Sequence, residues 1–191
     1  MLLTRISRRT RRVGAATLTG TLVLGGLFLA ARQADAATAF TSTAVNTGNS
    51  NCATVPGSTA GQQLNQSGCA SAANQSFSFT PVAGTADQYN VGTSTAGSCL
   101  DVSGAGTADN AQVIQWTCHS NANQRFQLRA AGAGPNTFNL VAVHSGKCVA
   151  PAGDAAAAGT ALVQITCSTA AARVWRLPGY SNTTPTTPPT G

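Results

Sequence analysis

Six cysteines carry the most specific chemistry in this 191-residue sequence, because a thiol can form a disulfide bond or bind a metal ion. Their second, fourth and sixth members, Cys69, Cys118 and Cys167, follow one another at intervals of 49 residues. Another cysteine precedes each of these three, so each interval contains one pair of cysteines. This pattern predicts three disulfides: Cys52–Cys69, Cys99–Cys118 and Cys148–Cys167. A zinc site is the competing interpretation, but the sequence has no Cys-x-x-Cys and only two histidines.

Side chains that could catalyse a reaction are scarce. The chain contains no Glu, and the acids that follow residue 36 are predicted to lie in different loops: Asp87, Asp101, Asp109 and Asp154. A typical glycosidase needs two carboxylates about 5 to 9.5 Å apart. Neither His119 nor His144 has an obvious nucleophilic partner, and there is no Gly-x-Ser-x-Gly motif or phosphate-binding glycine loop. The sequence therefore predicts no enzyme activity, no metal site and no cofactor.

The net charge of +6 at pH 7 is concentrated at the start of the chain. Six of the 11 basic residues precede residue 37, together with one acid, Asp35. The rest of the sequence holds five basic and four acidic residues. It lacks the clustered positive charge that nucleic-acid phosphates require, so we expect no nucleic acid among the partners.

The first 36 residues have the order of a secretory signal peptide. Residues 5–12 carry five arginines, residues 15–31 form an apolar run, and Ala34-Asp35-Ala36 offers a cleavage site between small residues. We expect cleavage there and a secreted protein that is free of the membrane. An uncleaved anchor is the alternative, although the run is short and interrupted by glycines. Ser7-Arg8-Arg9 also resembles a twin-arginine signal, but the general route suits disulfides that form after export.

The cysteine pairs belong to a longer internal repeat. Eight residues after each second cysteine stands an aromatic residue, and three residues before it stands a glutamine: Phe77, Phe126 and Trp175, and Gln66, Gln115 and Gln164. Ten residues before the first cysteine of the later repeats stand Tyr89 and Phe138, whereas the first repeat has Ser42 there. Three copies of one pattern indicate three equivalent units that share one core.

Apolar residues recur at every second position within a unit, which is typical of short strands with one buried face. Phe126 and Leu128 alternate with polar residues, and so do Phe138 and Leu140, although Val141 blurs the second pattern. The sequence therefore predicts an all-β fold of three repeats of about 49 residues with an aromatic core. Each disulfide would add roughly 3 kcal/mol of stability to this thin core.

Two segments, Asn74-Gln75-Ser76-Phe77 and Asn123-Gln124-Arg125-Phe126, resemble the Gln-x-Trp motif of ricin B-type lectin domains. Arg173-Val174-Trp175 is a third, altered copy, and Cys99-Leu100-Asp101-Val102 is similar to the Cys-hydrophobic-Asp-Val stretch of that family. The resemblance covers about residues 40–179. It implies a β-trefoil, in which three four-stranded units surround a pseudo-threefold axis and each unit offers up to one shallow sugar pocket.

A sugar pocket needs an aromatic face against the C–H side of the ring and fixed polar groups for the hydroxyls. The resemblance implies a hydroxyl-binding carboxylate at Asp101, a stacking aromatic at Trp116 and a polar partner at Asn123. Gln124 is the motif glutamine and is expected to be partly structural and partly ligand-facing. His119 is interpreted as a solvated turn residue, with a place at the pocket edge as the alternative.

The other two repeats lack these parts. The third has Ala150, Ile165 and Ala172 at the corresponding places, and the first has Thr54 and Ser67 although Asn74 and Gln75 remain. The sequence thus predicts one competent site, whose millimolar affinity would correspond to about −4 kcal/mol. The competing interpretations are a core position for Trp116 and a turn position for Asp101.

The resemblance implies that residues 37–179 form the lectin-like domain, with repeats at about 37–83, 84–132 and 133–179. The Thr/Pro-rich residues 180–191 are predicted to be a linker-like tail. We expect a non-catalytic monomer that binds a glycan or a polysaccharide. One alternative is a targeting module of a secreted glycoside hydrolase whose catalytic part is absent from this chain. Another is a trefoil that binds no sugar and acts as an inhibitor or a protein-interaction scaffold.

Overall fold

The computed structural model describes residues 37–132 and 134–181. The predicted signal peptide and residues 182–191 of the predicted tail lie outside the described residues. The described chain consists of 13 β-strands joined by turns and by 3-10 helices of three residues each. None of these described helices has the length and apolar character needed to cross a membrane. The predicted all-β fold is confirmed.

The strands fall into three groups that follow the sequence repeats. The first group is β1 (Phe40–Ser42), β2 (Val45–Asn46), β3 (Asn51–Thr54), β4 (Asn65–Gly68) and β5 (Phe77–Pro81). The second is β6 (Gln88–Gly92), β7 (Ser98–Val102), β8 (Val113–Thr117) and β9 (Arg125–Ala130). The third is β10 (Thr137–Ala142), β11 (Lys147–Pro151), β12 (Leu162–Ile165) and β13 (Trp175–Arg176). The 3-10 helices are η1 (Ala73–Gln75), η2 (Ser103–Ala105), η3 (Ala122–Gln124), η4 (Ala152–Asp154) and η5 (Ala171–Arg173).

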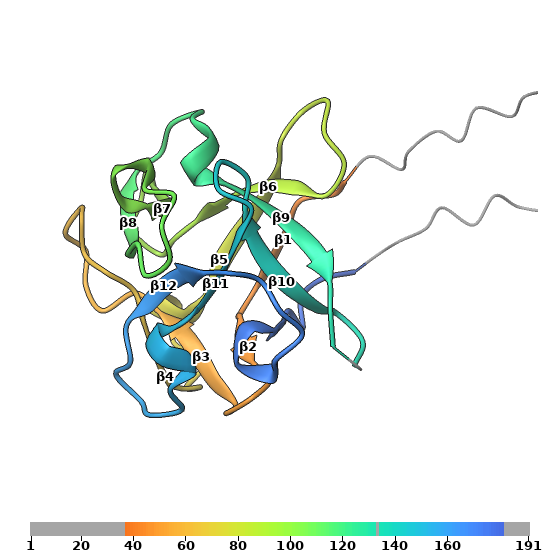
Figure 1. Cartoon of the computed structure of the whole chain (residues 1–191). Helices are drawn as coiled ribbons and strands as arrows, with labels where there is room; N and C mark the ends of the chain where they lie inside the picture. The colour runs from red at the N-terminus through yellow and green to blue at the C-terminus, as the bar shows by residue number, and fades with distance from the viewer. Residues whose placement is uncertain (1–36, 133, 182–191) are drawn as a thin grey trace, which may run out of the picture. The chain divides into compact units, whose positions relative to one another are not determined.

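A closed barrel and three hairpins make up the architecture (Figure 1). Antiparallel pairing runs in the order β1-β5-β6-β9-β10-β13-β2. Because β1 and β2 are successive parts of one stretch of chain, this order closes on itself. The remaining pairs are the hairpins β3–β4, β7–β8 and β11–β12, one in each unit. This is the β-trefoil that the resemblance implies.

Strand register puts the repeated aromatic residues at equivalent points of the barrel. Tyr89 pairs with Phe126, Phe138 pairs with Trp175, and Ser42 pairs with Phe77. Phe77, Phe126 and Trp175 are all at most 2% exposed. Their predicted core role is confirmed, and Ser42 does occupy the degenerate position in the first unit.

All three predicted disulfides are present: Cys52–Cys69, Cys99–Cys118 and Cys148–Cys167. Each bond lies within one unit and braces the hairpin of that unit. The zinc interpretation is therefore wrong, because the pairing leaves no free thiol. Structural disulfides persist in oxidising compartments, so they indicate an extracellular protein. Export by a signal peptide stays a prediction.

Strand β10 departs from the predicted alternation, since all six of its residues are buried. Asn139 faces away from the barrel core, yet its amide donates to the backbone oxygens of Ser168 and Arg173 at 3.2 and 2.7 Å. The segment that follows β12 therefore covers the outer face of β10. Val141 lies on the same outer face and is buried by this segment. Its burial explains why an apolar residue interrupts the predicted alternation.

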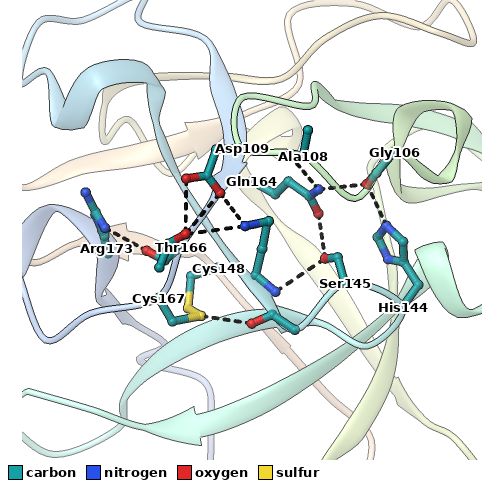
Figure 2. Close-up of polar contacts among 12 residues, drawn as sticks. Gly106, Ala108, Asp109, His144, Ser145, Cys148, Gln164, Thr166, Cys167 and Arg173 are labelled. Atoms are coloured by element: carbon teal, nitrogen blue, oxygen red, sulfur yellow. Dashed lines mark hydrogen bonds and ion pairs between the residues drawn. A yellow bond between two sulfur atoms is a disulfide. The ribbon is translucent and has the colours of Figure 1, made fainter.

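The three repeated glutamines hold the units together. Gln66, Gln115 and Gln164 are fully buried, and each donates its side-chain amide to two backbone oxygens in a hairpin loop of another unit. The contacted loops are 155–159 for Gln66, 57–61 for Gln115 and 106–110 for Gln164. Figure 2 shows Gln164 between Gly106, Ala108 and Ser145. The contacts form a cycle around the three units, and we call it the glutamine clamp.

The clamp also fixes one backbone position in every contacted loop. The N–H groups of Gly61, Asn110 and Gly159 donate to the backbone oxygens of Gln115, Gln164 and Gln66 at 2.7 to 2.8 Å. All three residues have a positive φ, of 83°, 69° and 85°. Glycine and asparagine tolerate this conformation best, so the residue types at these places follow from the loop geometry.

Candidate functional site

A pocket of about 380 Å³ opens beside the β7–β8 hairpin of the second unit. We call it the hairpin pocket, and it is lined by Asp101, Ser103, Gly104, Ala105, Ile114, Trp116, His119, Asn121 and Asn123. Three of the four residues predicted to bind a ligand therefore line a single cavity. Gln124, the fourth, does not.

The hairpin register explains why Asp101 and Trp116 meet. Asp101 on β7 lies opposite Ile114 on β8, and Trp116 is two residues farther along β8. Side chains two residues apart on a strand point to the same face. Asp101, Ile114 and Trp116 therefore share the hairpin face that forms the pocket floor. The hairpin register thus places a carboxylate diagonally across from an indole.

The carboxylate of Asp101 is buried and held from one side. Its Oδ2 accepts hydrogen bonds from Asn123 Nδ2 at 3.0 Å and from Gln124 Nε2 at 2.8 Å. His119 Nε2 lies 3.4 Å from the same oxygen. Oδ1 receives no hydrogen bond from the described residues and is not among the enclosed polar atoms, so it is open to the pocket. Asp101 is therefore a fixed acceptor, and the turn interpretation does not describe it.

The ring of His119 has a defined proton position. The backbone N–H of Asn121 donates to His119 Nδ1 at 3.3 Å, so the neutral ring carries its proton on Nε2, toward Asp101. His119 is about one-third exposed and lines the hairpin pocket. His119 is a partly exposed residue of the turn after β8, and it also takes the alternative position at the pocket edge.

Asn123 and Gln124 differ in what they offer to a ligand. Asn123 uses both amide hydrogens inside the protein, on Asp101 Oδ2 and on the backbone oxygen of Val102 at 3.2 Å. Its Oδ1 has no partner among the described residues and is not enclosed. Gln124 is fully buried and bonds Asp101, the Thr117 oxygen and the His119 N–H. Gln124 therefore orients the pocket from behind and presents no atom to it.

Trp116 is the one large hydrophobic side chain among the described residues that is exposed, at 45%. The core interpretation of Trp116 is therefore wrong. Its six-membered ring packs against the first unit, where a methyl group on Gly61 would lie 3.3 Å from Cζ3. The glutamine clamp fixes the loop at Gly61, since Gln115 bonds the oxygens of Gly57 and Thr59 at 2.6 and 2.9 Å. A loop of the first unit thus supports an aromatic residue of the second unit. The spacing of residues within one repeat cannot predict this contact between units.

The corresponding places in the other units hold different chemistry. In the first unit, Gln75 donates to the hydroxyl oxygens of Thr54 and Ser67 at 3.0 Å, and no aromatic is present. In the third unit, Arg173 replaces the motif glutamine and forms a two-pronged ion pair with Asp154, at 3.0 and 2.7 Å. Arg173 also donates to the Thr166 oxygen (Figure 2). Neither unit therefore has the carboxylate and indole that line the hairpin pocket.

The hairpin pocket offers a flat apolar ring, two outward acceptor oxygens and a histidine N–H. Such a set suits a small molecule with an apolar face and several hydroxyl groups. Among the described residues that line the pocket, Asp101 is the only acid, whereas a typical glycosidase uses a pair of carboxylates.

The sequence matches a protein family described as ricin-type beta-trefoil lectin domain-like, in three overlapping segments: residues 30–116, 73–164 and 122–187. No curated protein sequence matches the chain. Among solved structures, a designed threefold-symmetric protein called ThreeFoil is similar at 25% identity and a TM-score of 0.66, with 72% of this chain and 96% of that chain covered.

Two natural proteins of known structure share the fold at lower identity. A ricin B-like lectin from Macrolepiota procera, solved in complex with lactose, is 15% identical at a TM-score of 0.61, over 72% of this chain and 93% of that chain. An exo-beta-1,3-galactanase from Clostridium thermocellum is 18% identical at a TM-score of 0.66, over 72% of this chain and 30% of that chain. The chain therefore matches a whole lectin in one case and less than a third of an enzyme in the other.

Proposed function

This chain belongs to the ricin-type beta-trefoil lectin domain-like family, and from that premise we propose that it is a non-catalytic carbohydrate-binding module whose ligand occupies the hairpin pocket. One observation carries the proposal. The buried carboxylate of Asp101 keeps Oδ1 open to the pocket beside the exposed ring of Trp116. Burying a carboxylate is costly, and an outward oxygen next to an aromatic face is the arrangement that a sugar hydroxyl and a sugar ring require.

Each residue then has a distinct role. Trp116 stacks on the C–H face of one sugar ring, and Asp101 Oδ1 and Asn123 Oδ1 accept hydrogen bonds from its hydroxyls. The Nε2 proton of His119 lies at the pocket edge, within reach of a ligand oxygen. Gln124 is a positioning residue that holds Asp101 and the backbone around His119. A shallow site of this kind has an expected affinity in the millimolar range, about −4 kcal/mol.

The test compares the purified chain with variants of the two central residues. Isothermal titration with lactose and affinity electrophoresis in xylan, arabinan and mannan would measure binding. Asp101→Asn keeps an oxygen toward Asn123 and Gln124 and therefore turns an amide donor toward the ligand. We expect both Asp101→Asn and Trp116→Ala to weaken binding about tenfold or more. Because Trp116 is exposed, its loss has little effect on the free energy of unfolding.

Matched controls come from the third unit. Ile165 stands where the second unit has Trp116, and Asp154 is an acid of the same hairpin region. Ile165→Ala and Asp154→Asn should leave binding unchanged. If the chain binds a sugar and both pocket variants retain the wild-type affinity, the hairpin pocket is not the site. If no sugar in the panel binds, the non-binding trefoil scaffold becomes the better interpretation.

A second candidate function is the targeting module of a polysaccharide-degrading enzyme. The similarity to about a third of a galactanase chain favours it, since the trefoil is one part of that enzyme. In this role the module would hold insoluble substrate and would cleave nothing itself. Incubating the purified chain with insoluble β-1,3-galactan tests this role, because a targeting module should be retained on the polysaccharide and release no reducing sugar. Release of reducing sugar would contradict a non-catalytic module of either kind.

We also propose that the protein acts outside the cell as a monomer, with residues 1–36 removed as a signal peptide. Tyr180, the first residue of the predicted 180–191 tail, packs against Phe40 and Phe138, so we propose that the linker-like tail begins after it. The three disulfides support an extracellular environment. Mass spectrometry of the secreted protein tests the cleavage after Ala36. A mass that retains residues 1–36 would contradict it.

A further inference from the structure

A second pocket, of about 450 Å³, lies at the end of the barrel that the hairpins do not occupy. Its lining includes Asp87, Leu128, Asn136, Phe138 and Tyr180, and we call it the barrel-end pocket. In Figure 1 the turn between β5 and β6, the turn between β9 and β10 and the last described residues all lie on the side away from the β7–β8 hairpin. None of these residues belongs to the hairpin places where the family resemblance implies sugar pockets.

Asp87 stands apart from the other described acids because its carboxylate has no partner. Asp101 is hydrogen-bonded, Asp109 pairs with Lys147, and Asp154 pairs with Arg173. The side chain of Asp87 forms neither a hydrogen bond nor an ion pair with the described residues, and it is exposed. Its backbone is nevertheless fixed, since Leu128 N–H donates to its oxygen at 2.9 Å. A free carboxylate is thus held at the rim of a cavity.

Tyr180 supplies an aromatic wall that is fixed from three sides. Its ring packs edge-on against Phe138 and Phe40, with ring centres 4.8 and 5.2 Å apart. Asn136 Nδ2 donates to the Tyr180 backbone oxygen at 2.8 Å. Tyr180 is only half-buried, and burial together with the Asp87 charge raises the pKa of its phenol. Asp87 and Tyr180 thus line the same pocket.

The remaining polar group is the Oδ1 atom of Asn136. The Nδ2 atom of this amide is committed to Tyr180, whereas Oδ1 has no partner among the described residues and is not enclosed. Leu128 and Phe138 are at most 8% exposed and form an apolar floor. The barrel-end pocket therefore combines a free carboxylate, an amide oxygen and an aromatic ring over an apolar base.

We propose that the barrel-end pocket is a second sugar-binding site, so that one chain can hold two carbohydrate chains at opposite ends of the trefoil. This proposal rests on the function proposed above, and it adds a site that the threefold repeat does not generate. The free oxygens of Asp87 and Asn136 accept hydrogen bonds from hydroxyls, and Tyr180 covers the C–H face of the ring. A metal ion is a poor fit, because one carboxylate and one amide oxygen do not complete a coordination shell.

Two sites on one chain have a consequence that a single site lacks. A monomer with one site cannot bridge two polysaccharide molecules, whereas a monomer with two opposed sites can cross-link them.

The test is an NMR titration of the ¹⁵N-labelled full chain with methyl β-galactopyranoside, methyl β-xylopyranoside and methyl α-mannopyranoside, each tried alone. The backbone amide signals of Asn136 and Tyr180 report on the barrel-end pocket, and those of His119 and Asn123 report on the hairpin pocket. We expect at least one sugar to shift the barrel-end signals. Asp87→Asn should weaken that response about tenfold and leave the hairpin signals unchanged.

The variants keep the two proposals apart. Asparagine tolerates the positive φ of 57° at residue 87, so Asp87→Asn preserves the turn. Trp116→Ala should abolish the hairpin response alone, and Asp109→Asn is a charge-matched control that should change neither response. If the three sugars leave the barrel-end signals unmoved while the hairpin signals shift, this proposal is wrong and the proposed function stands. If tetramethylammonium moves the barrel-end signals and the sugars do not, the pocket takes a cation and this proposal is also wrong.

Discussion

Arg173 and Asp154 form an ion pair in the third unit at the place where the second unit joins Gln124 to Asp101. Two guanidinium nitrogens, Nε and Nη2, donate to the Asp154 carboxylate at 3.0 and 2.7 Å. Asp154 occupies the position that Ala105 has in the second unit, and both residues have a positive φ after a glycine. In the third unit the carboxylate is therefore supplied from a different position, by Asp154. It contacts the guanidinium group of Arg173 instead of facing a pocket. The third unit thus has an ion pair at the place where the second unit has the proposed binding site.

This ion pair should make the stability of the protein depend on pH. The hydrogen bonds from Arg173 hold the pKa of Asp154 below its ordinary value of 3.8. A depressed pKa in the folded state means that the stabilisation is present above about pH 4 and is lost as the pH falls through the folded-state value. Asp154→Asn should therefore lower the free energy of unfolding by about 1 kcal/mol at pH 7 and by progressively less as the pH falls below about 4.

Urea unfolding of both proteins at a series of pH values measures this difference. The Asp109–Lys147 pair titrates in the same direction, so Asp109→Asn serves as a comparison for an acid that is more exposed. An Asp154→Asn effect that stays constant from pH 7 to pH 2 would exclude the ion pair as its cause.

Gly61 should control the binding site although it belongs to another unit. A methyl group there would meet Trp116 Cζ3 at 3.3 Å, and a φ of 83° disfavours any side chain. Gly61→Ala should therefore cost about 1 kcal/mol of stability from backbone strain and should also displace the indole. We expect the sugar affinity to fall several-fold.

Gly159→Ala is the matched control for this substitution. Gly159 has a φ of 85° and the same place in the glutamine clamp, yet a methyl group there would meet nothing within 4 Å. The two variants should lose similar stability in urea unfolding, and only Gly61→Ala should lose affinity in isothermal titration. Equal affinities would show that Trp116 does not depend on its contact with Gly61.

The glutamine clamp should be a main source of stability between units. Gln115→Leu would leave the backbone oxygens of Gly57 and Thr59 without their buried donor. Gly57 and Thr59 are exposed, so water can replace part of this contact, and we expect a loss of about 1–2 kcal/mol. Gln127→Leu, at a half-exposed place on β9, should change the free energy of unfolding by less than about 0.5 kcal/mol. Similar urea midpoints for the two variants would contradict the clamp.

The predictable part of this molecule is the part that repeats. The Cys pairs and the aromatic residues recur within each unit, so they predicted the disulfides and the core. The resemblance to ricin B-type lectin domains, at matching offsets from Cys99 and Cys118, implied that Asp101 and Trp116 share one pocket. Contacts between units produce no repeated sequence pattern. The contact between Gly61 and Trp116 was therefore not predicted. The recurring glutamines were visible in the sequence, but their partners are backbone oxygens of other units, and a backbone oxygen has no residue-type signature.

The directions in which individual side chains point were the second feature that the sequence did not predict. The Gln124 motif was correctly located, but its complete burial depends on the Thr117 oxygen and the His119 N–H, both of which the fold brings to it. His119 lines the pocket because its Nδ1 accepts the Asn121 N–H, which turns Nε2 toward Asp101. A residue that follows a cysteine in a polar turn gives no sequence signal for that orientation. The barrel-end pocket likewise joins Asp87 and Tyr180, which are far apart in the chain and lie outside the repeat pattern.

Building a matching site in the third unit is the strictest test of the proposed site geometry. Ala150→Asp, Ile165→Trp, Ala172→Asn and Arg173→Gln would supply the carboxylate, the indole and the two amides at equivalent places, and Asp154→Ala would remove the former ion-pair partner. The glutamine clamp adds one requirement. Asn110 holds the place that Gly61 has behind Trp116, so its side chain would obstruct the new indole.

We therefore expect near-wild-type binding to return in a Trp116→Ala background when Asn110→Gly is added to these five changes. Isothermal titration should then give an affinity within about tenfold of the wild-type hairpin pocket, whereas the version that keeps Asn110 should bind more weakly. Equal affinities with and without Asn110→Gly would mean that the loop behind the indole does not position it. Failure of both versions, with urea unfolding showing a folded protein, would mean that sugar binding needs a contact beyond the residues that line the hairpin pocket.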